Sequence, residues 1–228
     1  MKGVFADRMQ DVPRSFIREI LKVTTDKSMI SFAGGLPNRQ YFPLEQLKES
    51  ANKVFDRRGT DCLQYSNSEG LLELRECISR RYKVEQGIDL PAERILITNG
   101  SQQALDLIAK VTINEGDPVV IEEPGYLGAI QALSLYRPRF LPIKVYAEGM
   151  DLSGLGGVIS ENPRMMYTVP NFQNPSGISY THENRCRIIE IIRDSDCLLV
   201  EDDPYGSLRF QGEPVASFHH LAPEQTIL

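Results

Sequence analysis

Two short polar segments, each placed after an apolar run, constrain the fold of this chain more than any other feature. The run at 165–169 is followed by NPSG at 174–177, and the run at 197–200 is followed by EDDPY at 201–205. A helix is predicted between them over 181–194, with a capping threonine and an early glutamate at its start. This pattern indicates a β-α-β unit with parallel strands. The polar segments should therefore meet at the carboxyl ends of the strands, where open sheets bind their ligands.

The same alternation extends over much of the chain. Strands are predicted over 95–98, 118–121, 139–145, 164–169 and 196–201, and helices over 101–112, 125–135 and 181–194. Such alternation favours a three-layer α/β/α fold with a mostly parallel sheet. We expect an N-terminal arm over 1–45, a helical segment over 46–90 with helices opening at Pro43 and Gly70, and a large domain over 91–228. We expect the sheet of that domain to be incomplete at its C-terminal end.

Charge and composition exclude several classes of partner. The 228 residues carry 25 Lys and Arg against 31 Asp and Glu, a net charge of −6, without a basic cluster, so nucleic acid is not an expected partner. No apolar run reaches membrane-spanning length and no signal segment opens the chain, so we expect a cytoplasmic protein. Cys62, Cys77, Cys186 and Cys197 are scattered, which predicts free thiols in or near the core and no metal site.

The acidic run at 201–203 offers the sharpest chemical clue. Asp202 follows a strand that would be buried, and a buried carboxylate needs a cation or hydrogen-bond donors to offset its desolvation. A protonated pyridine nitrogen would supply that cation. Tyr205, beyond a proline that stiffens the turn, could reach a hydroxyl on the same ring, and the Asn174 amide ends the adjacent strand. These groups suit a heteroaromatic cofactor, while the acidic run by itself is equally typical of a solvated turn or a divalent-metal site.

Two further strand ends could complete such a site. The segment 99–103 (NGSQQ) joins a strand to a helix, and a helix start with Gly100 and the Ser101 hydroxyl could hold a phosphate. Ser101 could instead be only an N-cap. Tyr126 follows the next strand and could stack on a planar cofactor, although a core or surface tyrosine is the simpler explanation of that residue alone.

Taken together, these motifs resemble the fold-type-I pyridoxal-phosphate enzymes, and within them the class I and II aminotransferases. The resemblance runs from about residue 15 to the end of the chain, and it is most specific at SFAGGLP (31–37), LQYS (63–66), NFQNPSG (171–177) and EDDPY (201–205). These stretches are similar to the subgroup of aminoadipate, kynurenine and aromatic aminotransferases. The resemblance implies a transferase of amino-acid metabolism that moves an amino group between an amino acid and a 2-oxo acid.

The resemblance also implies a role for each motif around pyridoxal 5'-phosphate. Asp202 would pair with the ring nitrogen, so that the ring can accept electrons from the substrate. Asn174 and Tyr205 would hydrogen-bond the ring oxygen, and Tyr126 would stack on the ring. Ser101 and the backbone of Gln102 would hold the phosphate.

Other positions match residues that act on the substrate or across a subunit interface. Tyr65 resembles a tyrosine that reaches the cofactor phosphate of the partner subunit, which implies a homodimer with shared active sites. Gly34 and Gly35 match an arm segment over the substrate. Arg18 matches a position that binds a distal substrate carboxylate in some members of the family.

One element of the family pattern is missing. The chemistry needs a lysine that bonds to the cofactor and moves a proton, and in the family this lysine follows a short strand beyond the tyrosine turn. The chain ends within the corresponding stretch, at 224–228, and Lys144 lies too early to be a candidate. We therefore expect an N-terminal portion of a longer enzyme, inactive alone, without the lysine, the arginine for the substrate α-carboxylate or the small C-terminal domain.

Other function classes share part of this pattern. A β-lyase or a decarboxylase of the same fold type would carry nearly all of these residues. The aminotransferase-like domain of a transcription regulator would bind an effector without catalysis. A nicotinamide-dependent dehydrogenase is disfavoured, because the segment 99–103 does not fit the G-x-G-x-x-G pattern.

Overall fold

The computed structural model describes residues 3–10, 35 and 37–228. Its residues group into two compact units, one formed by Met1–Pro13 with Arg75–Leu228 and the other by Arg14–Leu74. In the part of the chain that the structure describes, no helix is both long and apolar enough to cross a membrane.

The smaller unit is helical. It contains η2 (Arg39–Tyr41), α2 (Leu44–Arg58) and η3 (Gly59–Leu63). Helix α2 begins directly after Pro43, as predicted, and ends at Gly59, where a φ of 54° favours glycine. No residue of α2 is buried, so this helix has no apolar core of its own.

The larger unit contains the predicted sheet and its helices. Its main elements are α4 (Ser101–Thr112), β1 (Pro118–Glu123), α5 (Leu127–Ser134), β2 (Arg139–Tyr146), β3 (Gly149–Met150), α6 (Leu152–Val158), β4 (Met165–Thr168), α7 (His182–Ile192), β5 (Leu198–Glu201), α8 (Phe218–Leu221) and β6 (Thr226–Ile227). Helix α3 (Leu72–Gln86) precedes them, and short 3-10 turns lie at η1 (Asp7–Gln10), η4 (Ala92–Arg94), η5 (Ile159–Glu161) and η6 (Gly206–Leu208). The helix predicted to open at Gly70 is therefore present.

The sheet has the order β3-β2-β1-β4-β5-β6. Strands β2, β1, β4, β5 and β6 run parallel, and the two-residue strand β3 pairs antiparallel with β2. Strand β4 sits between β1 and β5, so the residues that follow these three strands lie at the same edge of the sheet.

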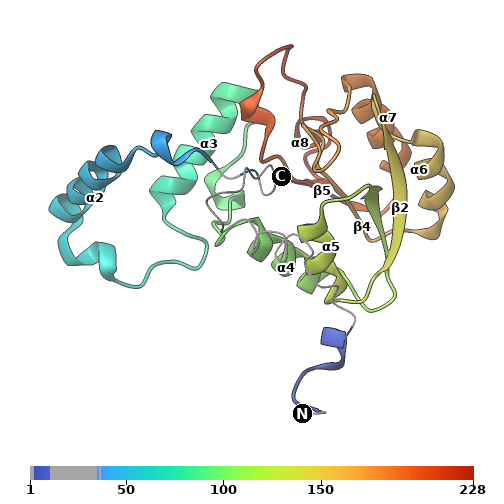
Figure 1. The fold of residues 1–228 in the computed structure, drawn as a ribbon, viewed down its shortest axis with the longest axis horizontal. Helices are drawn as coiled ribbons and strands as arrows, with labels where there is room; N and C mark the ends of the chain where they lie inside the picture. Colours follow the sequence, from blue (N-terminus) through green and yellow to red (C-terminus); the bar gives the residue numbers. More distant parts are fainter. Residues whose placement is uncertain (1–2, 11–34, 36) are drawn as a thin grey trace, which may run out of the picture. The chain divides into compact units, whose positions relative to one another are not determined.

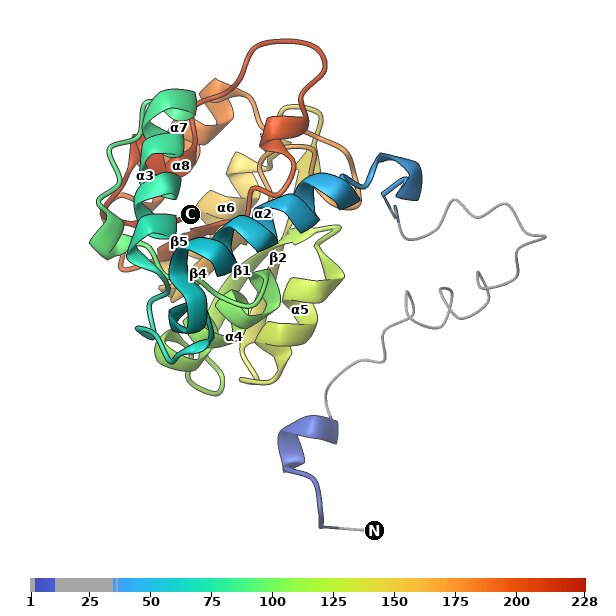
Figure 2. The ribbon, with the colours of Figure 1, turned by 90° about the vertical axis from the view of Figure 1, so that its left-hand side faces the viewer.

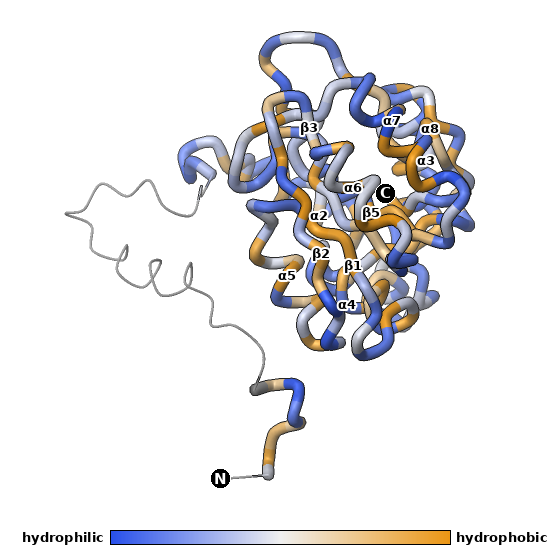
Figure 3. Tube along the Cα trace, turned by 90° about the vertical axis from the view of Figure 1, so that its right-hand side faces the viewer, coloured by the Kyte–Doolittle hydropathy of each residue, from blue (hydrophilic) through white to orange (hydrophobic). Residues whose placement is uncertain are grey.

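Helices cover both faces of the sheet. On one face, the core is formed by residues of α4 and α5 and by every second residue of the strands. It includes Leu105, Ala129, Leu133, Val119, Met165, Tyr167 and Val200. On the other face it contains residues of α6, α7 and α8 with Leu155, Ile188, Ile192, Phe218, Val120, Met166 and Leu199. Figures 1 and 2 show the two helical layers, and Figure 3 shows that hydrophobic residues occur along the strands between them. The predicted three-layer α/β/α fold with a mostly parallel sheet is confirmed.

Several element predictions need correction. No strand forms over 95–98, because these residues join no hydrogen-bonded ladder in the described part of the chain. They instead line a cavity of about 530 Å³ together with Thr226 and Ile227 of β6. Helix α5 begins at Leu127 rather than Gly125, and α6 and α8, short helices without a long apolar period, were not predicted.

The cysteines are free, as predicted, but only one lies in the core. Cys197 is buried, Cys62 and Cys186 are partly exposed, and Cys77 is exposed. Burial raises the pKa of the Cys197 thiol to about 12, so this cysteine is a packing residue and a poor nucleophile.

Candidate functional site

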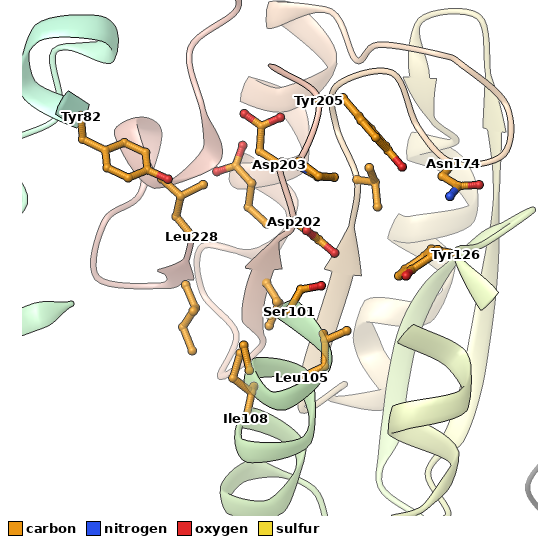
Figure 4. Close-up of a pocket in the computed structure, with 16 residues that line it drawn as sticks. Tyr82, Ser101, Leu105, Ile108, Tyr126, Asn174, Asp202, Asp203, Tyr205 and Leu228 are labelled. Atoms are coloured by element: carbon orange, nitrogen blue, oxygen red, sulfur yellow. The ribbon is translucent and has the colours of Figure 1, made fainter. Parts of the chain in front are cut away.

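A cavity of about 420 Å³ opens where β4 and β5 end, beside the first turn of α4. Its lining includes side chains predicted from the sequence to bind a cofactor, which are Ser101, Tyr126, Asn174, Asp202 and Tyr205. Figure 4 shows them around one space, with the Tyr205 ring extending toward Asn174. The parallel strand order thus brings together residues that are far apart in the sequence.

The carboxylate at the base of this cavity belongs to Asp202. It is partly buried, and its Oδ2 accepts a hydrogen bond of 2.7 Å from the Tyr167 hydroxyl. Burial raises the pKa of Asp202, the Tyr167 hydrogen bond opposes that rise, and the neighbouring Asp203 adds to it. Among the described residues no Lys, Arg or His forms an ion pair with Asp202. A cationic ring nitrogen in the cavity would supply the missing positive charge, so this site fits the predicted cofactor.

The acidic turn is not a solvated one. Glu201 is only 2% exposed, and Asp202 and Asp203 are partly buried. In the described ranges no group of three or more His, Cys, Asp or Glu side chains is placed to hold a metal ion. Neither alternative explanation of this run is therefore supported by the geometry.

Helix α4 presents its N-terminus to the cavity. The helix begins at Ser101, and the preceding Gly100 has a φ of 78° and provides no side-chain cap. Ser101 therefore occupies the first helical position and is not the N-cap, which leaves its hydroxyl and the first N–H groups of α4 available to an anion. The side chain of Gln102 does not line the cavity, in keeping with a predicted role for its backbone only.

The Tyr126 ring folds back over the start of α5. A Cβ atom at Gly128 would lie 2.5 Å from Cζ and from the hydroxyl of Tyr126, and 2.8 Å from Nε2 of Gln102. Glycine at position 128 is thus needed for this position of the ring. The sequence prediction did not include Gly128, and the close packing after Tyr126 is visible only in three dimensions.

A buried carboxylate positions the loop that carries Asn174. Glu122 is 1% exposed, and its Oε1 accepts hydrogen bonds from the Val169 N–H (2.9 Å) and the Tyr180 hydroxyl (2.8 Å). Its Oε2 accepts one from Nε2 of Gln173 (2.9 Å), and this nitrogen also donates to the Pro124 carbonyl (2.7 Å). Burial raises the pKa of Glu122, and the three donors oppose that rise. The end of β1 is thereby tied to the residue next to Asn174.

A second buried network lies on the same face of the sheet, between α7 and the end of β5. The side chains of Arg185 and Glu201 are both inaccessible to solvent and lie 3.7 Å apart. Arg185 also donates to Oδ1 of Asn171 (2.7 Å) and to the Pro170 carbonyl (3.1 Å), at the start of the Asn174 loop. Burial raises the pKa of Glu201 and lowers that of Arg185, while the mutual attraction of the two groups opposes both shifts.

The remaining predicted residues lie away from the described cavity or outside the described residues. Arg18 and Gly34 belong to the part that the structure does not describe. Gly35 is exposed, with a φ of 53°. Tyr65 belongs to the smaller unit, where its side chain is 99% exposed. The roles of these four residues stay predictions.

Comparison with known proteins relates this chain to one family. A family model described as aminotransferase class I and II matches residues 28–228. The chain is 42% identical over 223 residues to a 2-aminoadipate transaminase of Thermus thermophilus, covering 97% of this chain and 54% of that protein. It is 38% identical over 217 residues to an aromatic-amino-acid aminotransferase of Thermococcus litoralis, covering 92% of this chain and 52% of that protein.

A solved structure gives the same result in three dimensions. The crystal structure of Pyrococcus horikoshii kynurenine aminotransferase, in complex with PMP, superimposes with a TM-score of 0.87 at 36% identity. The match covers 98% of this chain and 57% of that one. The chain spans about half the length of the curated relatives it matches.

Proposed function

Because the chain belongs to the family of class I and II aminotransferases, we propose that the whole protein is a pyridoxal-phosphate-dependent aminotransferase. The observation that carries the proposal is the cavity with Asp202 at its base, a partly buried carboxylate without a cationic partner among the described residues. The family assignment confirms the resemblance that the motifs indicated.

Each residue around the cavity would bind a different part of the cofactor. Pyridoxal phosphate, when bound, supplies an electron sink for the electrons left on the substrate Cα after its proton is removed. Asp202 would hold the ring nitrogen protonated, and Asn174 and Tyr205 would donate hydrogen bonds to the ring oxygen. Tyr126 would cover one face of the ring and exclude water from it.

The phosphate would lie at the N-terminus of α4. The Ser101 hydroxyl and the first N–H groups of the helix are hydrogen-bond donors at the positive end of a helix dipole. None of the described residues that line the cavity is a lysine or an arginine. We therefore propose that the lysine of the reaction comes from a part of the protein beyond these residues.

The proposed substrates are an amino acid and a 2-oxo acid. The relatives are named for 2-aminoadipate, aromatic amino acids and kynurenine, so these compounds form the first panel of amino donors to test. The amino group of the donor would pass to the 2-oxo acid in a second half-reaction at the same site.

The intact protein is expected to bind pyridoxal phosphate and to convert this panel only when a 2-oxo acid is present. Binding is measured by an absorbance band in the near-ultraviolet or visible range that borohydride bleaches. Turnover without a 2-oxo acid, with release of carbon dioxide or of a β-substituent, would instead identify a decarboxylase or a β-lyase. Intact protein that gains no band with added cofactor would contradict the proposal altogether.

We further propose that the protein is a homodimer with shared active sites. Tyr65 is fully exposed, and helix α2 in the same unit has no buried residue, which favours a partner surface for this part of the chain. In such a dimer the Tyr65 hydroxyl would donate to the phosphate held at Ser101 of the other subunit.

Complementation in a mixed dimer would test the shared site. One chain carries Tyr65→Phe with Asp202 intact, and the other carries Asp202→Ala with Tyr65 intact. Each parental homodimer is expected to bind the cofactor about ten- to hundredfold more weakly, the effect of one lost charge-assisted contact. The hybrid should regain one site of wild-type affinity per dimer in a cofactor titration. A hybrid no tighter than its parents, or a Tyr65→Phe homodimer with wild-type affinity, would show that Tyr65 acts elsewhere.

A further inference from the structure

The hydroxyl of Tyr167 makes a hydrogen bond that no sequence motif predicts. Tyr167 lies on β4 and is 2% exposed, and its hydroxyl donates a hydrogen bond of 2.7 Å to Oδ2 of Asp202. In the sheet Tyr167 is paired with Val200, two residues before Asp202. The Asp202 N–H also donates to the Thr168 carbonyl, at 2.9 Å, so backbone and side chain both tie this carboxylate to β4.

Tyr167 is a core residue beside the cavity. It does not line the cavity, and it belongs to the apolar core between the sheet, α4 and α5. Val169 and Val200, which do line the cavity, are members of the same core. The polar contact that links Tyr167 to the cavity is its hydrogen bond to Asp202.

The surroundings of Tyr167 make its hydroxyl a permanent donor. Burial raises the pKa of Tyr167 far above its ordinary value, and the negative charge of Asp202 raises it further. Asp203 and Glu122 both interact electrostatically with Asp202, and neither can donate a hydrogen bond when ionised. Tyr167 is thus the one side chain among the described residues from which Asp202 accepts a hydrogen bond.

We propose that Tyr167 is a positioning residue, whose hydroxyl donates a hydrogen bond to Oδ2 of Asp202. This bond keeps the carboxylate ionised and directs its Oδ1 to the ring nitrogen of the cofactor. The inference rests on the proposed function for the identity of that ring. A carboxylate with one oxygen already hydrogen-bonded is a weaker base, so the proton between Asp202 and the ring stays on the nitrogen. Without the hydroxyl the proton moves toward Asp202.

The variant Tyr167→Phe removes one oxygen atom and leaves the packing of the ring in place. In the intact holoprotein loaded with cofactor labelled with ¹⁵N at the ring nitrogen, we expect the ¹⁵N resonance to move toward the value of an unprotonated pyridine. Turnover should fall about ten- to hundredfold, as for the loss of one hydrogen bond to a charged group, with the KM of the amino acid unchanged.

Tyr136→Phe is the matched control. The Tyr136 hydroxyl donates to Oδ1 of Asp106 at 2.8 Å, between α4 and the residues after α5, and neither residue lines the cavity. This variant loses the same atom and the same kind of hydrogen bond. We expect it to keep the wild-type ¹⁵N resonance and turnover.

Two further measurements separate this inference from folding defects and from the proposed function. A fluorinated tyrosine at position 167 is a stronger donor and should move the ¹⁵N resonance in the direction opposite to Tyr167→Phe. In the cofactor-free protein, the ¹³Cγ resonance of Asp202 should titrate at higher pH in Tyr167→Phe than in wild type, whatever ring the cavity binds. The proposal is wrong if the Asp202 titration is the same in both proteins, or if the holoprotein shows no ¹⁵N change with either substitution. In that case Asp202 merely provides a hydrogen-bond acceptor for the buried Tyr167 hydroxyl.

Discussion

Replacing Asp202 with asparagine in the intact protein is expected to lower turnover by several orders of magnitude. An amide of the same size keeps an acceptor for the Tyr167 hydroxyl but carries no charge, so it cannot hold a proton on the ring nitrogen. Removal of one preorganised electrostatic partner in an active site costs about 10²–10³ in rate, and here the electron sink itself depends on that partner. The measurement is the turnover number at saturating cofactor and substrate.

Asp203→Asn is the internal control for this prediction. Oδ1 of Asp203 accepts a hydrogen bond of 2.9 Å from the Gly206 N–H, so the side chain stabilises the turn that leads to Tyr205. An amide oxygen can accept the same bond, and we expect turnover within about tenfold of wild type. Equal losses in the two variants would show that the charge of the whole acidic turn matters and not the pairing of Asp202 with the ring.

The meeting of Ser101, Tyr126, Asn174 and Asp202 could be predicted from the sequence. Tyr126, Asn174 and Asp202 follow predicted strands that form, and the right-handed connections of parallel strands place such ends at one edge of the sheet. Ser101 reaches the same cavity as the first residue of the predicted helix α4, although the strand predicted before it does not form. The segment 95–98 shows the limit of the same reasoning. Its β-branched residues fit a strand, but a strand also requires a hydrogen-bonded neighbour, and the described residues contain none beside it.

The supporting networks could not be predicted from the sequence. Tyr167 has the appearance of one more apolar residue in a buried strand, and its acceptor lies 35 positions further along the chain. A carboxylate directly after the apolar run 119–121 indicates only weakly that Glu122 is buried and needs donors. Its partner Gln173 follows 51 positions later in the sequence. Contacts at such separations depend on strand order, which local patterns do not specify.

Arg185 shows most clearly how a polar residue can occupy a core position. It precedes Ile188, Ile189 and Ile192 by three, four and seven positions on α7, so it lies on the buried stripe of that helix. An arginine there requires partners, and it has Glu201, Asn171 and backbone carbonyls at Pro170 and Ala216. The resulting link joins α7 to the end of β5 and to the loop before Asn174.

Arg185→Met is therefore expected to reduce the free energy of unfolding of the intact protein by about 3–5 kcal/mol, because it leaves the Glu201 carboxylate buried without a counter-ion. Urea unfolding at a fixed protein concentration measures the change. Arg187→Met, on the same helix, breaks an exposed pair with Glu190 and should cost less than about 1 kcal/mol.

The double variant Arg185→Met with Glu201→Gln identifies the cause of the loss. If the unpaired charge dominates, removal of that charge restores part of the stability, and the double variant costs less than the sum of the two single variants. Because Arg185 also holds Asn171 and Pro170, the double variant should still bind the cofactor more weakly than wild type, even where its stability has recovered. A cost of Arg185→Met no larger than that of Arg187→Met would contradict the argument, since it would mean that water or a rearranged loop compensates Glu201. The stability of the sheet and the position of Asn174 would then both depend on a buried guanidinium that does not line the cavity.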